Sequence, residues 1–523
     1  MLTFTVTPYS PDPLWRFDTS QRRYTSQDGQ SFLAPVRHTL LENLALTDGA
    51  RTLLVVRERA TGRATCEPGI RVVEPSEFDD AVAQAQRWPL DFVTILTEPG
   101  HPAIIQAGPR PACPLYLAHD GRSVHGTWEM GDLRRFATGI ENVEAARLLI
   151  YKPRYTHQTL FTGIFRLTER STAYFGGDLY LRYPAPALHA AARELVDGAD
   201  VLNAFDTALD LALTAHPIAE AATWFHLSGG FDSATLATRA AAANPGAYPT
   251  SALLIGGPGR TQQERRRAKL RAAAPFAEAD VLIDAMDRLP LDPECVRAKG
   301  LPISPYEEAL HNPFRLLTAA MADAGAQAVV TGLGGDEMVA LTEDERAHSE
   351  LIEVPVMPWH GTAAQDALAY GDIGIAPPAL VNNMTLLSME TTAPILLRQG
   401  IYPVHPFTHP ALVDLGEQLP YDWRLLKQLH RRRLARLGLD GDVVLPVHRE
   451  SFAEVVRAAL TSHGVGLLRT LLRTGSPLIE CQLVDPDQLA AAVTRLEAGG
   501  YSENRESQLL EVIDLHLAAV AFL

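Results

Sequence analysis

One stretch, TWFHLSGGFDSATLATRAAA at residues 223–242, constrains the fold of this chain more than any other. An apolar run rich in aromatic side chains ends at a serine and two glycines, and an alanine-rich helical pattern follows. Further apolar runs occur in YPTSALLIGG and AQAVVTGLGG, and amphipathic helical patterns separate them. Strands that alternate with helices in this way predict βαβ units and a parallel sheet.

The junction between this strand and its helix carries the residue types that an anion site needs. Gly229 and Gly230 permit positive φ and let a phosphate approach the main chain, and the helix N-terminus offers free N–H groups. Ser228 and Ser233 can add hydroxyl donors, whereas Asp232 alone would repel a phosphate and therefore indicates a Mg²⁺ between them. The string matches neither the Walker A nor the Rossmann pattern. The alternative is an ordinary glycine-rich turn in which Asp232 caps the helix.

A second loop repeats this arrangement. AVVTGLGGDEMVA at residues 328–340 is another apolar strand that ends in glycines, with Asp336 and Glu337 at its exit. Ligands of a parallel α/β sheet bind at the carboxyl ends of its strands. Two acidic loops on neighbouring strands can share Mg²⁺ on a triphosphate, although this loop alone is also compatible with a plain turn.

Length and composition indicate a multidomain protein of the cytoplasm. The 523 residues exceed one typical domain, and the net charge of −16 argues against a nucleic-acid or membrane-surface footprint. The four cysteines lack C-x-x-C spacing, which predicts a reducing compartment and no zinc site. We see no signal peptide and no apolar run long enough for a transmembrane helix.

Two domains are expected. Residues 1–190 read as short β-rich segments, such as RTLLVVRERATG and STAYFGGDLYLRYP, and the proline-containing stretch 183–191 reads as a linker. Residues 196–523 contain the strand–helix alternation. Their last part, roughly 379–523, has helical patterns, and we expect it to wrap the parallel sheet.

Five matches in a fixed order, the last of them made of two consecutive segments, carry a resemblance to a known family. The two glycine loops, about a hundred residues apart, resemble the synthetase domain of asparagine synthetase, in the ATP pyrophosphatase superfamily that cleaves ATP to AMP and pyrophosphate. RTQQERRRAKLRA (260–272) resembles its Asp-Glu helix, with Glu264 retained and glutamine in place of the aspartate. YPVHPFTHPALVDLGEQLP (402–420) resembles its PFLDP segment, with His409 for the aspartate. LLKQLHRRRLARLG and LPVHRESFAEVV resemble its Lys-x-x-x-Arg helix and RPKEAF ending, so the resemblance covers about 196–460.

The resemblance implies ATP and Mg²⁺ as cofactors and a doubly wound, adenine nucleotide α-hydrolase-like domain with extra C-terminal helices. It implies that Asp232 and Asp336 bind the metal. The nucleotide-binding positions that it implies are Leu227, Ser228, Gly229, Gly230, Asp232, Ser233, Ile255, Glu264, Gly332, Leu333 and Gly334.

The N-terminal half resembles a class II glutaminase domain, a β-rich sandwich, in residues 108–137 and 159–175. Glutaminases of this class use an N-terminal cysteine as nucleophile and amine base. Here Leu2 and Thr3 follow the first methionine, and no cysteine precedes Cys66. We therefore expect a degenerate domain that serves as a scaffold or a recognition surface.

Several positions depart from the family pattern. Leu333 stands where asparagine synthetases carry glutamate and β-lactam synthetases tyrosine, and it cannot relay a proton. Glu390, in SMETTAPILLRQG, is the candidate replacement base, or else a surface or capping acid. Arg449 replaces the lysine of RPKEAF and can bind phosphate but cannot donate a proton. His448 is a candidate proton donor, and Lys427 a candidate active-site or salt-bridge residue.

These observations predict an ATP-dependent carbon–nitrogen ligase that adenylates a carboxylate and couples it to a substrate amine rather than to glutamine-derived ammonia. By resemblance, lasso peptide cyclases and β-lactam synthetases are the nearest subgroups. The expected substrate is a small molecule or peptide with a carboxylate and an amine, and a leader-peptide-binding or precursor partner and a homodimer remain open. The alternatives are an inactive binding protein and an ammonia-dependent asparagine synthetase.

Overall fold

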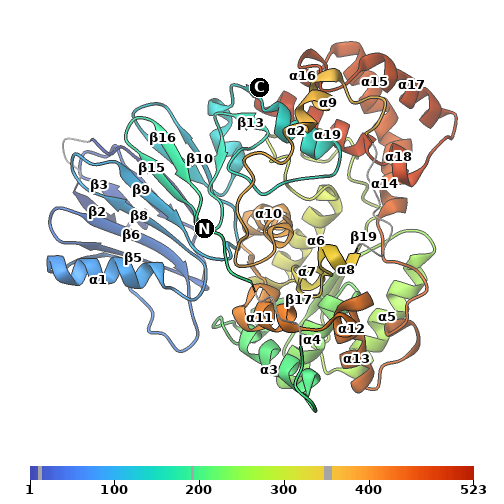
Figure 1. The fold of residues 1–523 in the computed structure, drawn as a ribbon, viewed down its shortest axis with the longest axis horizontal. Helices are drawn as coiled ribbons and strands as arrows, with labels where there is room; N and C mark the ends of the chain where they lie inside the picture. The colour runs from blue at the N-terminus through green and yellow to red at the C-terminus, as the bar shows by residue number, and fades with distance from the viewer. Residues whose placement is uncertain (10–13, 190–193, 347–355) are drawn as a thin grey trace.

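The computed structural model describes residues 1–9, 14–189, 194–346 and 356–523. Three parts are visible in Figure 1: a β-sandwich, a parallel sheet with its flanking helices, and a C-terminal helical lobe. The fold is therefore α/β, with β-sheets in the N-terminal half and a parallel sheet in the C-terminal half, as the sequence predicted. Residue 190, the predicted end of the first domain, lies outside the described residues.

The N-terminal half is a sandwich of two seven-stranded sheets. Leu2–Val6 of the first sheet alternates apolar and polar residues, so that one face enters the core. Thr52–Glu58 and Phe92–Thr97 of the second sheet are buried at consecutive positions, because Phe78 of a helix packs on the other face of that sheet. The first sheet has the order β14-β10-β11-β1-β4-β3-β2 and the second β16-β15-β9-β8-β6-β5-β7. The strands are β1 (Leu2–Val6), β2 (Trp15–Asp18), β3 (Arg23–Ser26), β4 (Phe32–Pro35), β5 (Leu41–Thr47), β6 (Thr52–Glu58), β7 (Ile70–Val72), β8 (Phe92–Thr97), β9 (Ala103–Ala107), β10 (Tyr116–His119), β11 (Val124–Thr127), β14 (Phe165–Arg166), β15 (Thr172–Phe175) and β16 (Leu179–Arg182).

The C-terminal half is built on a five-stranded parallel sheet of order β19-β18-β17-β20-β21. Its strands are β17 (Thr223–His226), β18 (Thr250–Leu254), β19 (Asp280–Asp284), β20 (Ala328–Val330) and β21 (Tyr402–Val404). Chain order runs outward in both directions from β17 and β20, so a topological switch point lies between these two neighbours. A ligand crevice is expected outside the carboxyl ends of these two strands.

Helices cover both faces of this sheet because successive strand residues point to opposite sides. Trp224 packs with α6 (His311–Asp323) and α10 (Asn383–Arg398), whereas Phe225 packs in the core that contains α3 (Val201–Leu213) and α4 (Phe231–Ala243). The same core continues into the sandwich through Leu2 and Phe4. The other helices around the sheet are α5 (Gly259–Ala273), α7 (Gly335–Met338), α8 (Glu343–Arg346), α11 (Pro410–Gln418), α12 (Tyr421–Arg424) and α13 (Gln428–Arg436).

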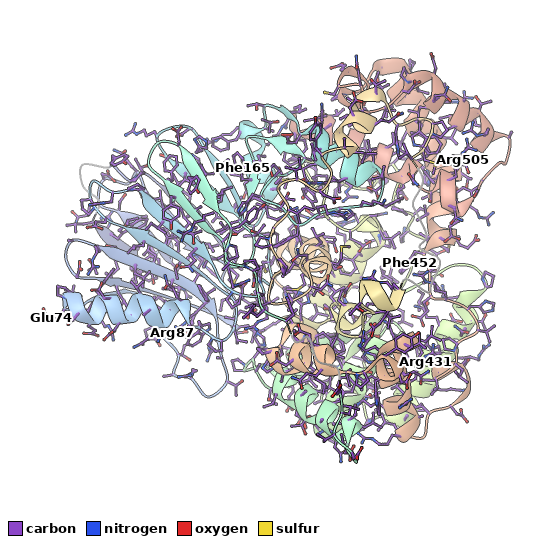
Figure 2. The ribbon with its side chains drawn as sticks, viewed as in Figure 1. Glu74, Arg87, Phe165, Arg431, Phe452 and Arg505 are labelled. Carbon is purple, nitrogen blue, oxygen red and sulfur yellow. The ribbon has the colours of Figure 1, made fainter. Side chains whose placement is uncertain are left out.

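The expectation that residues 379–523 wrap the sheet holds for α10 to α13 and is corrected for the helices that follow. From α14 (Ala453–Ala459) onward they form a separate lobe whose core includes residues of the N-terminal half, such as Met130 and Phe161. Phe522 stacks on Phe161 with ring centroids 4.3 Å apart. In Figure 2, Phe452 lies where the chain enters this lobe and Arg505 lies within it. The remaining helices are α1 (Pro75–Gln86), α2 (Asn142–Leu149), α9 (Thr362–Leu368), α15 (Val465–Thr474), α16 (Pro477–Glu480), α17 (Pro486–Glu497), α18 (Glu503–Glu506) and α19 (Leu509–Phe522).

Candidate active site at the sheet switch point

The loop after β17 forms a compact turn that opens α4. Gly229 has φ +100°, a conformation that a residue with a side chain rarely adopts. The Gly230 N–H donates to Ser228 Oγ at 3.1 Å, and Ser228 Oγ lies 3.1 Å from Ser233 Oγ. Gly230 is the N-cap of α4, so the free N–H groups of the helix face the loop. The turn presents main-chain donors and two hydroxyls in one place, as an anion site requires.

The loop after β20 packs directly against the first loop. A Cβ at Gly332 would lie 3.0 Å from Ser233 N, and a Cβ at Gly335 would lie 2.6 Å from Asp232 Cβ. Gly334 has φ +92° and caps the short helix α7, which starts at Gly335. The glycines thus allow the two loops to touch and bring Asp232 close to Asp336.

Lys427 joins the two acids. Its ammonium Nζ lies 2.6 Å from Asp232 Oδ2 and 2.7 Å from Asp336 Oδ1. The backbone at Lys427 is left-handed, with φ +57°, which places this strained residue at the start of α13. Burial lowers the pKa of Lys427, but Asp232 and Asp336 more than offset this effect and raise it above its ordinary value. The lysine therefore stays charged and neutralises the acid pair.

The residues present fit a Mg²⁺ ion that is held together with nucleotide phosphates. Asp232 Oδ1 is buried without a hydrogen-bond donor, and His430 Nε2, 3.5 Å away, is also buried and unsatisfied. Burial, followed by the nearby Lys427, lowers the pKa of His430 to about 3, so its ring is neutral. Within the described ranges, no three His, Cys, Asp or Glu side chains are grouped to hold a metal alone. Asp232 and Asp336 would thus supply two oxygen ligands, and phosphate oxygens would complete the set.

Gln263 and Glu450 support the first loop, and neither was among the predicted site residues. The Gln263 carboxamide donates to the Ser228 and Leu253 carbonyls, each at 3.0 Å, and accepts from Ile255 N at 2.9 Å. Glu450 lies over the loop, with Oε1 3.3 Å from a Cβ built at Gly229, and binds Arg266 Nη1 at 2.5 Å. Gln263 and Glu450 are the direct sequence neighbours of Glu264 and Arg449, which the sequence predicted as site residues.

Three predicted site residues do not reach the loops. Glu264 is exposed on α5 and binds Arg260 Nε at 2.7 Å, because a helix turns its neighbour Gln263 inward instead. His448 and Arg449 are exposed, and the His448 main chain is held by the Gln262 carboxamide. In the described part of the chain, the side chains of His448 and Arg449 have no hydrogen bond to either glycine loop.

Glu390 is not placed as a base. It lies in α10, is 4% exposed, and binds Arg166 of the N-terminal half, with Arg166 Nε 2.9 Å from Glu390 Oε2. The Tyr116 hydroxyl donates to Glu390 Oε1 at 2.5 Å. The structure thus places this candidate base in a buried ion pair between the two halves, and it has no hydrogen bond to either glycine loop among the described residues.

The other predicted nucleotide contacts divide between main chain and side chain. The Leu227 and Ile255 side chains are buried in the core, so only their main chain can face the crevice. Leu333 is half-buried in the second loop, between Gly332 and Gly334. Of the predicted set, the structure brings the Ser228–Ser233 loop, Gly332–Gly334, Asp336 and Lys427 together.

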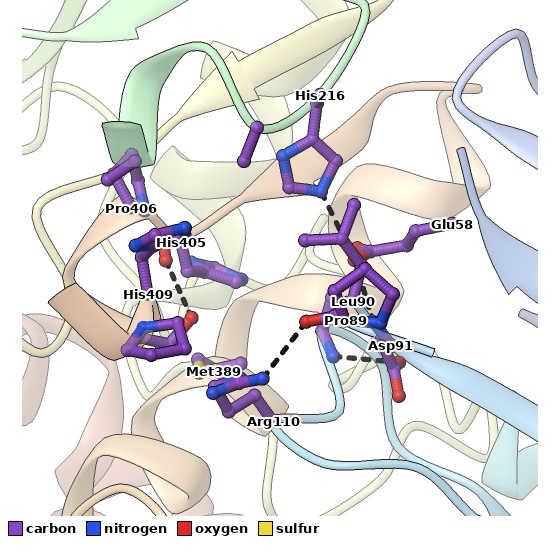
Figure 3. A pocket seen from close by; sticks show the side chains of 15 residues that line it. Glu58, Pro89, Leu90, Asp91, Arg110, His216, Met389, His405, Pro406 and His409 are labelled. Carbon is purple, nitrogen blue, oxygen red and sulfur yellow. Dashed lines mark hydrogen bonds and ion pairs between the residues drawn. The ribbon is translucent and has the colours of Figure 1, made fainter. Parts of the chain in front are cut away.

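A small cavity between the two halves is separate from this site (Figure 3). It has a volume of about 30 Å³, enough for one or two water molecules. Glu58 holds the halves together here: His216 Nε2 lies 3.1 Å from Glu58 Oε2, and the Tyr402 hydroxyl donates to Glu58 Oε1 at 2.9 Å. Burial and the neighbouring Glu58 raise the pKa of Asp91 well above its ordinary value. The cavity is a buried polar contact and is too small for a substrate.

The fold and the site define an α/β domain with two glycine loops and a pair of acids at the switch point of its parallel sheet. Residues 204–370 match the family model of asparagine synthase. The match contains both loops, supports an asparagine synthetase-like family, and supports ATP-dependent amidation chemistry. No curated protein matches the chain. Across the described ranges, no helix combines the length and the apolar character needed to cross a membrane.

Proposed function

We infer that the protein is an ATP-dependent ligase that adenylates a substrate carboxylate, releases pyrophosphate, and joins the acyl group to an amine that another substrate group supplies. The observation that carries this proposal is the contact between the two glycine loops. Because of this contact, the carboxylates of Asp232 and Asp336 both form ion pairs with the Lys427 ammonium. A binding protein without turnover has no need of such a paired-acid site. The family match, which supports amidation chemistry in general, agrees with it.

The residues of the site have separate tasks in this reaction. The main-chain N–H groups at Gly229 and Gly230, with the Ser228 and Ser233 hydroxyls, would bind phosphate oxygens. Bound Mg²⁺ would neutralise the charge of the departing pyrophosphate. Lys427 would remain beside the phosphates as a fixed positive charge, and such preorganised charge stabilises a transition state without reorganisation.

The cysteines support an amine source other than glutamine. Cys113, in the N-terminal half, is 6% exposed, and burial raises the pKa of its thiol to about 12. A buried thiol with such a pKa is a poor nucleophile. Cys66, the other cysteine of this half, accepts from Arg57 Nη2 at 3.4 Å, next to Glu42. Neither supplies the N-terminal cysteine that glutaminases of this class use.

We place the products within peptide or secondary metabolism, with a lasso-type macrolactam or a β-lactam-type ring as the candidate products.

Calorimetric titration with Mg·ATP tests the proposal. The intact protein should bind Mg·ATP, and Asp232→Asn and Asp336→Asn should each weaken binding by at least tenfold, because each removes one metal ligand. Asp487→Asn, at an exposed acid of α17 in the C-terminal lobe, is the matched control and should bind normally. AMP and pyrophosphate release with carboxylate–amine pairs would then identify the substrates.

A second candidate is a partner protein that retains the fold without turnover. Lys427 favours it, since its ammonium lies between the two acids where a metal would bind. Absence of Mg·ATP binding in the intact protein would establish this second candidate over the first.

A further inference from the structure

A large pocket lies beside the second glycine loop. Its volume is about 640 Å³, within the range of about 300–1,000 Å³ that accommodates a drug-sized ligand. Gly334 and Glu337 form the wall nearest the acid pair, and α10 contributes Asn383 and Thr385. The pocket therefore shares the second glycine loop and α7 with the acid pair. Ammonia would leave almost all of this volume empty.

Much of the pocket wall is apolar. The apolar contributors include Met338, Leu341, Ile375, Val381, Phe407 and Val413. Removal of apolar surface from water contributes roughly 0.8 kcal/mol per buried CH₂ group. The wall therefore favours a ligand with a hydrocarbon body.

One acid at the inner end of this pocket has no basic partner. Asp336 and Glu337 are adjacent in α7, so the helix turns them in different directions: Asp336 meets Lys427, whereas Glu337 lines the pocket. No Lys, Arg or His nitrogen of the described residues lies within ion-pair distance of Glu337; its side chain interacts with Thr385. The Glu337 carboxyl oxygens therefore have no cationic partner among the described residues and can accept from an N–H of a ligand in the pocket.

The other polar groups of the wall suit an amine more than an acid. Glu417 at the far wall lies 2.5 Å from His189 Nδ1, and Arg346 at the rim has an interaction of its own. Asn383 Oδ1 is a buried acceptor without a donor in the described structure. An unpaired acid and an unsatisfied acceptor both attract a hydrogen-bond donor.

We propose that this pocket binds the amine substrate, that its apolar wall holds the hydrocarbon body of that substrate, and that Glu337 receives the amino group. Glu337 would hold the amino group by accepting hydrogen bonds from its N–H groups, and the apolar wall would orient the rest of the molecule. This proposal rests on the proposed function and names its nucleophile class: an amine with an apolar body, as in a peptide or an alkylamine, in place of ammonia.

The test uses ethylamine, butylamine, hexylamine, hexanol and hexanoate as probes, with binding measured by ligand-observed NMR on the full chain. Affinity should rise about three- to fourfold per methylene in the amine series. Hexylamine should bind better than hexanoate. Glu337→Gln should weaken hexylamine binding roughly tenfold, as expected for loss of a charge-assisted hydrogen bond, and should leave hexanol binding unchanged.

A pocket-filling variant gives a second readout. Ala340 is exposed at the pocket wall, so Ala340→Trp should reduce hexylamine and hexanol binding together. Ala490→Trp, at an exposed site on α17, is the control and should not. Four results would overturn the proposal. They are an amine affinity that does not depend on chain length, tighter binding of hexanoate than of hexylamine, no binding of hexylamine, and equal effects of the two tryptophan substitutions. Mg·ATP titration of the same samples reports on the proposed function separately.

Discussion

Gly335 shows how a single missing side chain sets the geometry of the site. A Cβ at this position would lie 2.6 Å from both Cβ and Cγ of Asp232. Gly335→Ala must therefore displace the loop or the acid, and overpacking of this kind costs about 1–3 kcal/mol. We expect Mg·ATP affinity to fall at least tenfold, measured by calorimetry.

The matched control for this substitution is Gly466→Ala. Gly466 lies in α15, and a Cβ there would meet no atom within 4 Å. Alanine should stabilise the helix by roughly 0.5–1 kcal/mol and leave nucleotide affinity unchanged. Equal Mg·ATP affinities for the two variants would show that the loop contact does not position Asp232.

Lys427 is expected to compete with the metal for the two acids. In Lys427→Met, Asp232 and Asp336 lose their cation, so stability without metal should fall by about 1–3 kcal/mol. Mn²⁺ binding in the absence of nucleotide should tighten roughly tenfold and restore that stability. Electron paramagnetic resonance of bound Mn²⁺ and thermal unfolding measure the two effects.

Lys269→Met provides the comparison, because Lys269 pairs with Asp440 and Asp442 at the surface, outside the crevice. It should change neither Mn²⁺ affinity nor the response of stability to Mn²⁺. If Lys427→Met leaves Mn²⁺ affinity unchanged, the lysine does not occupy the metal position.

At the scale of elements, α10 links the two halves of the chain through ion pairs, and the more buried of them joins Arg166 and Glu390. Arg166 in β14 and Glu390 in α10 are 2% and 4% exposed, respectively. Removal of one partner from a buried pair costs about 3–5 kcal/mol because the other charge is left uncompensated. Glu390→Ala should therefore lose that much stability in denaturant unfolding. Because Asn383 and Thr385 of the same helix line the large pocket, hexylamine binding should weaken as well.

An exposed ion pair provides the control for the buried Arg166–Glu390 pair. Glu294 pairs with Lys299, and both side chains are more than half exposed, so Glu294→Gln should change stability by less than about 1 kcal/mol. Similar losses in the two variants would mean that the Arg166–Glu390 pair does not hold the halves together.

At the scale of the whole molecule, docking of the helical lobe buries an acid at a cost in stability. Burial, reinforced by Asp514, raises the pKa of Glu511 in α19 from 4.5 to about 8. Between these pH values the folded state keeps a proton that the unfolded chain has lost, so stability falls as the pH rises. Glu511→Gln removes this penalty and should gain about 1–3 kcal/mol at pH 8 and little at pH 5.

The measurement is thermal or denaturant unfolding at both pH values. Glu503→Gln, at an exposed position of α18, should show no such pH-dependent gain. A gain for Glu511→Gln that is equal at pH 5 and pH 8 would contradict a raised pKa.

Local patterns were enough to predict much of this protein. The apolar runs before Ser228 and Gly332 become β17 and β20, and the alanine-rich pattern that follows Asp232 becomes α4, because these signals act over a few neighbouring residues. The same spacing predicted that Asp232 and Asp336 would meet, since neighbouring parallel strands end at one edge of a sheet. The short β-rich segments RTLLVVRERATG and STAYFGGDLYLRYP likewise become strands of the sandwich, namely β6, β15 and β16.

Only the tertiary structure decided which side chains face the site in the segment between the two glycine loops and in the segment that follows the second loop. Gln263 rather than Glu264, and Glu450 rather than Arg449, reach the first loop, because the orientation of a segment depends on the packing of distant elements. The destination of Glu390, in an ion pair with Arg166 224 residues away in the chain, depends on how the two halves dock. The position of the helical lobe also depends on this docking. Its apolar faces could cover either the parallel sheet or the N-terminal half, and in the structure they pack with residues of the N-terminal half. Periodicity identifies a buried face but carries no information about its partner.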